Sequence, residues 1–156
     1  LKDEKVAAPA EATVFETGSN VWRTFDQWPP KNVESKQLFL NEKGGLSYTQ
    51  PTQKESSGGF DEFVSDPNKP VPYSETVTPR MTIEYMVDDQ RFASRRPDVL
   101  TYQTVAFTED TVVAGPIAAD LWVSTTGTDA DWIVKLIDVR PDGPDGGRRL
   151  CVCGGR

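Results

Sequence analysis

The chain has 156 residues, of which 37% are hydrophobic and 26% charged, with 17 basic and 24 acidic side chains. This length and composition predict a globular protein of one domain with a real apolar core. The net charge of −7 argues against nucleic acid and anionic membranes as partners, because their negative charges would repel the surface. No apolar run approaches the roughly 20 residues that a membrane-spanning helix needs.

Histidine is absent from the sequence. The commonest general base and the commonest transition-metal ligand are therefore missing. A self-contained Ser-His-Asp or Cys-His site is excluded, although carboxylates alone could still support catalysis. Within this chain we expect no catalytic residue, no bound metal and no cofactor.

The first third of the chain predicts short strands separated by turns. Residues 1–11 are expected to be a linker or frayed lead-in without the apolar segment of a signal peptide, and without an initiator Met they suggest a processed chain or a fragment. Strands are expected at 12–17, 21–25, 36–40 and 46–49, with turns at 18–20 and 41–45.

The middle of the chain predicts mostly irregular structure. Residues 50–59 are polar and rich in Gly and Ser, 60–64 are a strand candidate, and 65–73 carry three prolines. The irregular segment extends to about residue 98, with one helical turn expected near 89–94.

Strand signals become dense in the last third. They fall at residues 99–107, 111–113, 117–125 and 131–139, with turns at 127–129 and 140–147. Many short strands separated by turns, without an amphipathic helix, are typical of an all-β sandwich or barrel.

Two stretches resemble the C-terminal jelly-roll domain of the CocE/NonD serine hydrolases, a family that includes X-Pro dipeptidyl peptidases and α-amino acid ester hydrolases. They read YMVDDQRFASRRPDVLTYQT from residue 85 and VAGPIAADLWVSTTGTDADWIVKLIDVRPDG from residue 113. FETGSNVWRTFDQWPP, from residue 15, is similar to the opening of that domain. The resemblance implies a jelly-roll-like, galactose-binding-like β-sandwich over residues 12–143.

The resemblance also implies an upstream α/β-hydrolase domain and helical cap that would carry the catalytic triad. No G-x-S-x-G nucleophile elbow occurs in this chain. The implied function is that of a non-catalytic accessory domain, which shapes the active-site wall of an ester or amide hydrolase and supports domain or subunit contacts. The family includes bacterial periplasmic and cytoplasmic enzymes, so the resemblance leaves the location open.

The end of the sequence departs from the family pattern. Residues 144–156 are expected to be an atypical tail, and the sandwich to be incomplete. Missing strands would leave open sheet edges, which predicts self-association of the chain. Cys151 and Cys153 are too close in sequence for an easy disulfide and too few for a metal site, so we interpret them as structural or as an artefact of this terminus.

A polar cluster in the second half of the chain has two interpretations, which the sequence leaves open. Its members could form an interface with the hydrolase domain through charge-assisted bonds, or an internal ion-paired loop that braces this connection. The cluster consists of Asp88, Asp89, Gln90, Arg91, Arg95 and Arg96.

Two further residue sets have alternative interpretations. Trp22 and Trp28 are a candidate aromatic surface, and the second candidate function is a stand-alone carbohydrate-binding module; Trp122 and Trp132 are expected in the core or at a domain interface. The acidic set could suggest a Ca²⁺ site, but its spacing fits no EF-hand, and its turn positions favour capping of backbone N–H groups. It comprises Asp120, Asp129, Asp131 and Asp138.

Overall fold

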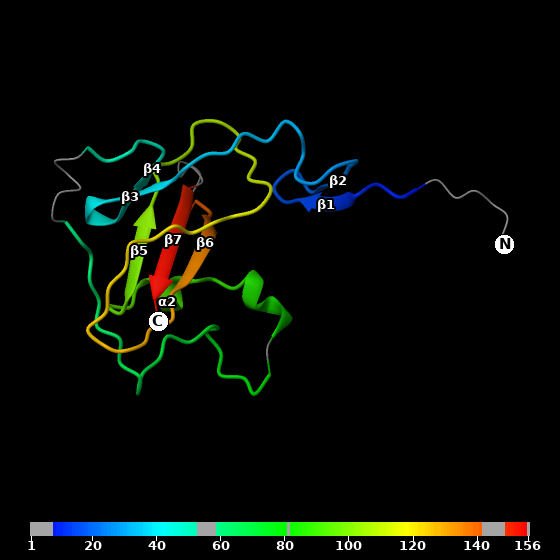
Figure 1. Cartoon of the computed structure of the whole chain (residues 1–156). Coiled ribbons are helices and arrows are strands. Elements are labelled where there is room, and N and C mark those ends of the chain that lie inside the picture. The colour runs from blue at the N-terminus through cyan, green and yellow to red at the C-terminus, as the bar shows by residue number, and fades with distance from the viewer. Residues whose placement is uncertain (1–7, 53–58, 81, 142–148, 156) are drawn as a thin grey trace. The chain divides into compact units, whose positions relative to one another are not determined.

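The computed structural model describes residues 8–52, 59–80, 82–141 and 149–155, and this part of the chain contains two sheets and little helix (Figure 1). The chain divides into two compact units. One comprises residues 1–35 with 111–119, and the other comprises 36–110 with 120–156. The two sheets and the small amount of helix in the described residues confirm the predicted all-β class.

The smaller unit contains an antiparallel hairpin of β1 (Ala12–Glu16) and β2 (Val21–Phe25), as the sequence predicts. Gly18 and Asn20 adopt positive φ angles in the turn, a conformation that Gly and Asn tolerate best. An ion pair joins the strands, with 2.6 Å between Arg23 Nε and Glu16 Oε2. The hydrogen bond from Arg23 lowers the pKa of Glu16 to about 2.

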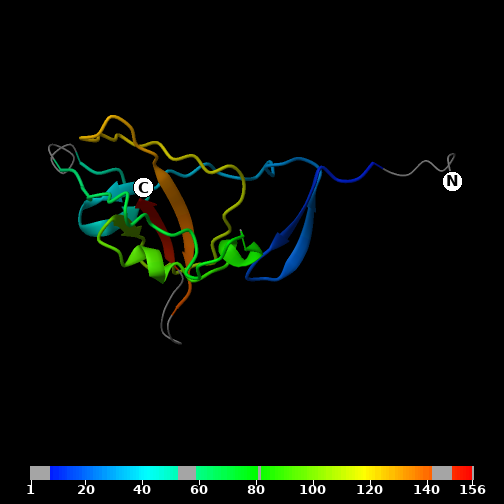
Figure 2. The ribbon, with the colours of Figure 1, turned by 90° about the horizontal axis from the view of Figure 1, so that it is seen from below.

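The larger unit contains a five-stranded sheet in the order β3-β4-β5-β7-β6, antiparallel except between β4 and β5. Figure 2 shows β6 and β7 side by side from below. The strands are β3 (Phe39–Asn41), β4 (Gly45–Ser47), β5 (Val99–Gln103), β6 (Ile133–Val139) and β7 (Arg149–Gly155).

Strand β7 lies inside the sheet and pairs on both sides, with β5 and with β6. The sequence analysis assigned its residues to an atypical tail because this end of the chain departs from the family pattern. The structure places them in a strand because both backbone edges find partners and the small side chains of Cys151 and Cys153 are buried. The sequence analysis ended the folded domain at residue 143, whereas β7 lies beyond that position.

Several predicted strands are not strands in the structure. Residues 60–64, 104–107, 111–113 and 117–125 have no strand assignment, and Trp122 is fully exposed. The apolar pattern of 117–125 suits a strand, yet none of the described strands pairs with this segment. Trp122 therefore lies outside the core in which the sequence analysis placed it as one option.

The helical elements are short. They are η1 (Glu42–Gly44), η2 (Ile83–Met86) and α2 (Arg91–Ser94), and α2 confirms the helical turn expected near residues 89–94. In the described residues, no helix has the length and apolarity to cross a membrane. The buried apolar side chains all belong to the larger unit: Leu46, Ala93, Tyr102, Cys151 and Cys153.

Gly44 allows the chain to pass from β3 to β4 directly beside β5. Its φ is +72°, and a Cβ atom added there would lie 2.8 Å from the carbonyl oxygen of Thr101. We therefore expect Gly44→Ala to lower the free energy of unfolding by about 1–3 kcal/mol, because it adds backbone strain to a clash with main-chain atoms. Urea unfolding followed by tryptophan fluorescence measures the change.

Gly127→Ala is the matched control for Gly44→Ala. A Cβ at Gly127 would meet its nearest neighbour, Thr125 Oγ1, at an ordinary 3.6 Å. The control should change the free energy of unfolding by less than about 1 kcal/mol. Equal effects of the two substitutions would contradict the packing described for the β3–β4 connection.

Candidate functional site

The polar cluster predicted from the sequence surrounds the short helix α2 and divides into inner and outer residues. Asp88, Gln90 and Arg96 are part-buried, whereas Asp89, Arg91 and Arg95 are exposed. The structure thus brings the six predicted residues into one region of the larger unit. The two halves of the cluster have different contacts.

The inner residues brace the fold. Gln90 accepts a hydrogen bond from Lys135 Nζ on β6 at 2.9 Å, and its amide nitrogen donates to the carbonyl oxygen of Asp88 at 2.9 Å. Arg96 donates to the Asp98 carboxylate at 2.8 and 2.6 Å and to the carbonyl oxygen of Lys69 at 2.8 Å. These contacts match the interpretation of an internal bracing loop.

The pKa of Asp98 lies below its usual value because its carboxylate accepts hydrogen bonds from the Arg96 guanidinium. Opposite charges at hydrogen-bond distance favour the ionised form of both groups. Thr101 Oγ1, on β5, also donates to the carbonyl oxygen of Ser94 at 3.1 Å. The segment that follows α2 is therefore fixed to both the sheet and the Pro-rich segment near Lys69.

The outer residues form a charged surface. Asp89 accepts hydrogen bonds from the backbone N–H of Arg91 at 2.9 Å and from its Nε at 2.6 Å. The side chains of Arg91 and Asp89 are 64% and 49% exposed, and their pairing lowers the pKa of Asp89. An ion pair this exposed stabilises a fold little, so Asp89, Arg91 and Arg95 stay candidates for a domain interface.

The candidate aromatic surface lies in the smaller unit. Trp22 is 67% exposed and packs against Phe15, with 5.3 Å between ring centroids. Trp28 is part-buried and packs edge-on against Phe25 at 5.5 Å. These contacts cover part of each ring, and a role of Trp22 and Trp28 in binding stays a prediction.

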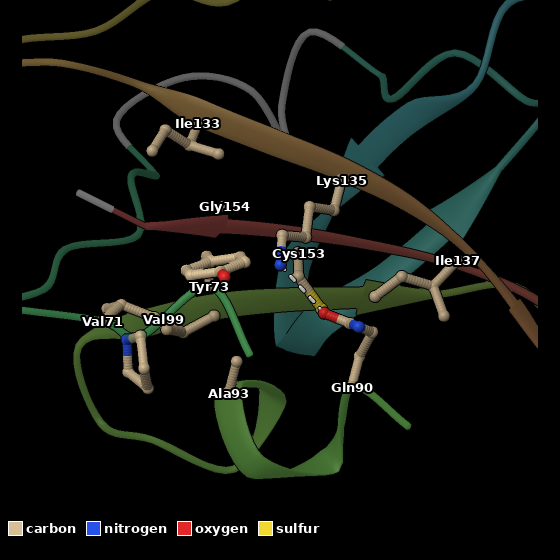
Figure 3. Close-up of a pocket in the computed structure, with 11 residues that line it drawn as sticks. Val71, Tyr73, Gln90, Ala93, Val99, Ile133, Lys135, Ile137, Cys153 and Gly154 are labelled. Carbon is tan, nitrogen blue, oxygen red and sulfur yellow. Dashed lines mark hydrogen bonds between the residues drawn. The ribbon is translucent and has the colours of Figure 1, made fainter. Parts of the chain in front are cut away.

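A pocket of about 100 Å³ lies between α2 and the sheet, and the sequence analysis did not anticipate it (Figure 3). Its lining residues are mostly apolar, and two of them, Cys153 and Lys135, carry chemically active groups. A period of two along β7 and β6 could have placed these side chains on one face, but the sequence does not reveal which strands are neighbours. The lining residues are Val71, Pro72, Tyr73, Gln90, Ala93, Val99, Ile133, Lys135, Ile137, Cys153 and Gly154.

Among the described residues, no group of three or more His, Cys, Asp or Glu side chains could hold a metal ion, and this includes the acidic set considered for Ca²⁺. Tyr102 donates a 2.6 Å hydrogen bond to Asp61 Oδ2. Burial and this bond raise the Tyr102 pKa, which suits a structural contact rather than proton transfer at neutral pH.

Comparison with known proteins places the chain in a family. A family model described as the X-Pro dipeptidyl-peptidase C-terminal non-catalytic domain matches residues 4–154. The cocaine esterase of Rhodococcus sp. (strain MB1 Bresler) is 29% identical over 157 residues, which cover 97% of this chain and 27% of that protein.

A solved structure also matches nearly the whole chain. The crystal structure of an aminopeptidase from the marine sediment archaeon Thaumarchaeota archaeon matches with a TM-score of 0.85 and 31% identity, over 97% of this chain and 34% of that one. Its matching fold confirms the β-sandwich class. The chain spans between a quarter and about a third of the length of these two relatives. It belongs to the family of X-Pro dipeptidyl-peptidase C-terminal non-catalytic domains.

Proposed function

We propose that this chain is the accessory β-sandwich of a serine hydrolase that cleaves esters or amides by acyl transfer. In the proposed arrangement it packs on an upstream α/β-hydrolase domain and shapes one wall of that domain's active site. The observation that carries the proposal is the extent of the match. The comparisons cover nearly all of this chain but only 27% and 34% of two hydrolytic relatives, the esterase and the aminopeptidase.

The absence of histidine supports a division of labour between domains. The chain has no imidazole to activate a serine or a cysteine. Its contribution to the reaction would be binding geometry and stability, while proton transfer belongs to the hydrolase domain. The hydrolase domain would carry both the serine nucleophile and its general base.

Exposed apolar side chains in the larger unit support a docking surface. Strand β6 is one of the two edge strands of the described five-stranded sheet, and Ile133 on it is 56% exposed. Large apolar side chains that remain exposed commonly mark contacts with other domains. Besides Ile133, the exposed set between residues 121 and 134 comprises Leu121, Trp122, Val123, Trp132 and Val134.

The same exposed apolar side chains also support self-association of the chain. An open strand edge beside exposed apolar side chains can pair with a second copy when no other domain covers it.

The outer charged residues Asp89, Arg91 and Arg95 would fix the orientation of the hydrolase domain through charge-assisted hydrogen bonds. The net charge of −7 disfavours nucleic acid and anionic membranes as partners.

The division of labour predicts that the 156-residue chain alone is inactive. With p-nitrophenyl butyrate and with an X-Pro p-nitroanilide, its rate should equal that of a control with Ser56, Ser57 and Ser94 replaced by Ala. A longer form of the protein that includes the hydrolase domain should hydrolyse at least one of these substrate classes. Saturable hydrolysis by the chain alone, abolished by a serine-directed fluorophosphonate, would contradict the proposal.

The docking role predicts a specific effect of Asp89→Ala. In the longer form we expect kcat/KM to fall about fivefold or more, because a misplaced accessory domain distorts the active-site wall. In the isolated chain the same substitution should move Tm by a few degrees at most, since the Asp89–Arg91 pair is exposed.

Asp110→Ala, at another exposed aspartate of the larger unit that lies outside residues 121–134, is the control for Asp89→Ala. It should leave both kcat/KM and Tm close to those of the parent. An Asp89→Ala variant of the longer form with unchanged kcat/KM would refute the interface role of the outer charged residues.

A further inference from the structure

The two cysteines of β7 lie on one face of the central strand. Side chains two residues apart in a strand share a face, and residues directly opposite on neighbouring strands share it too. Cys153 is opposite Thr101 on β5 and opposite Lys135 on β6. The register therefore places one thiol between a hydroxyl group and an ammonium group.

A second thiol and a hydroxyl group lie close to the Cys153 sulfur. Cys151 Sγ and Thr101 Oγ1 each lie 3.6 Å from Cys153 Sγ. Lys135 is held by its 2.9 Å hydrogen bond to Gln90, and its Nζ lies 6.0 Å from the centroid of the Phe92 ring. In Figure 3 the dashed line joins the Lys135 ammonium group to the Gln90 amide oxygen.

This environment favours Cys153 as the anion of the thiol pair. The hydrogen bond with Cys151 and the charge of Lys135 lower the pKa of Cys153, although burial opposes them. The pKa of Cys151 is raised, because its proton is shared with the neighbouring sulfur and its thiol is buried. The thiolate is the nucleophilic form of cysteine, so ionisation concentrates reactivity on one of the two sulfurs.

The pocket gives a small molecule access to Cys153. Cys153 lines the pocket and Cys151 does not, although both residues are buried in the sheet. The volume of about 100 Å³ is several times the roughly 10–15 Å³ that one water molecule needs. The apolar side chains of Val71, Val99 and Ile133 favour a compact, uncharged molecule.

We propose that Cys153 is a covalent modification site, which takes compact α,β-unsaturated carbonyl compounds from this pocket. The Cys153 sulfur adds to the β-carbon, where a carbon–sulfur bond forms and the carbon–carbon π bond breaks. The freed electron pair moves onto the carbonyl oxygen as an enolate, and Lys135 stabilises that negative charge. A proton from water then reaches the α-carbon, so no group leaves and no oxidant is needed.

The remaining pocket groups are compatible with this chemistry. Among the described lining residues, Lys135 is the cation and Tyr73 the other titratable group besides Cys153. The Tyr73 hydroxyl donates to the carbonyl oxygen of Arg80 at 3.1 Å, and Gln90 is neutral. Among the described residues that line the pocket, Lys135 therefore supplies the positive charge that acts on Cys153.

Acrylamide is the probe, and peptide mapping by mass spectrometry measures its addition to each cysteine from pH 5 to pH 9. In the native chain we expect Cys153 to react at least tenfold faster than Cys151. Its rate should rise with pH around a midpoint about one unit or more below that of the urea-unfolded chain. Cys153→Ser should abolish the fast adduct, whereas Cys151→Ser should retain it.

Lys135→Met and Lys135→Arg separate electrostatics from packing. Loss of the charge should raise the pH midpoint of alkylation toward that of the unfolded chain, and the arginine variant should keep most of the parent behaviour. Thermal unfolding checks that each variant is folded. If Lys135→Met does not fold, the comparison of Cys153 with Cys151 in the native chain tests the proposal instead. Equal rates at the two cysteines, or a midpoint equal to that of unfolded protein, would overturn the proposal.

Discussion

Strand β7 pairs with β5 and β6, two strands that come from distant parts of the sequence. Its backbone hydrogen bonds join them into one sheet, and its small side chains Cys151 and Cys153 are buried. The short helix α2 contacts the neighbouring strand β5. The larger unit buries few large apolar side chains, so it depends strongly on these ladders. Because β7 lies between β5 and β6, Thr101 and Lys135 lie on either side of Cys153. Residues of β5, β6 and β7 together line the pocket.

Local signals predicted much of the fold correctly. The hairpin of β1 and β2 follows from alternating apolar residues on each side of Gly18-Ser19-Asn20, and β5 and β6 follow from their β-branched content. The sequence analysis did not predict β7, because residues 144–156 depart from the family pattern and were interpreted as a tail. A strand also depends on its neighbours, and for that reason the apolar pattern of 117–125 does not yield one here.

The candidate site shows the same limit at the level of side chains. The sequence identified the polar cluster but not its division into residues that brace the sheet and residues that face solvent. That division depends on contacts such as Gln90 with Lys135, which are 45 positions apart in the chain. In the proposed function, the exposed Asp89 and Arg91 and the exposed apolar side chains of β6 belong to the surface that the hydrolase domain covers.

Hydrogen–deuterium exchange tests this account most directly, by comparison of the isolated chain with a longer form that includes the hydrolase domain. The account predicts that amides of residues 121–125 and 89–95 exchange more slowly in the longer form, because the hydrolase domain covers them. Amides of β5 in the sheet interior should exchange alike in both forms. Equal exchange of residues 121–125 and 89–95 in the two forms would contradict the account.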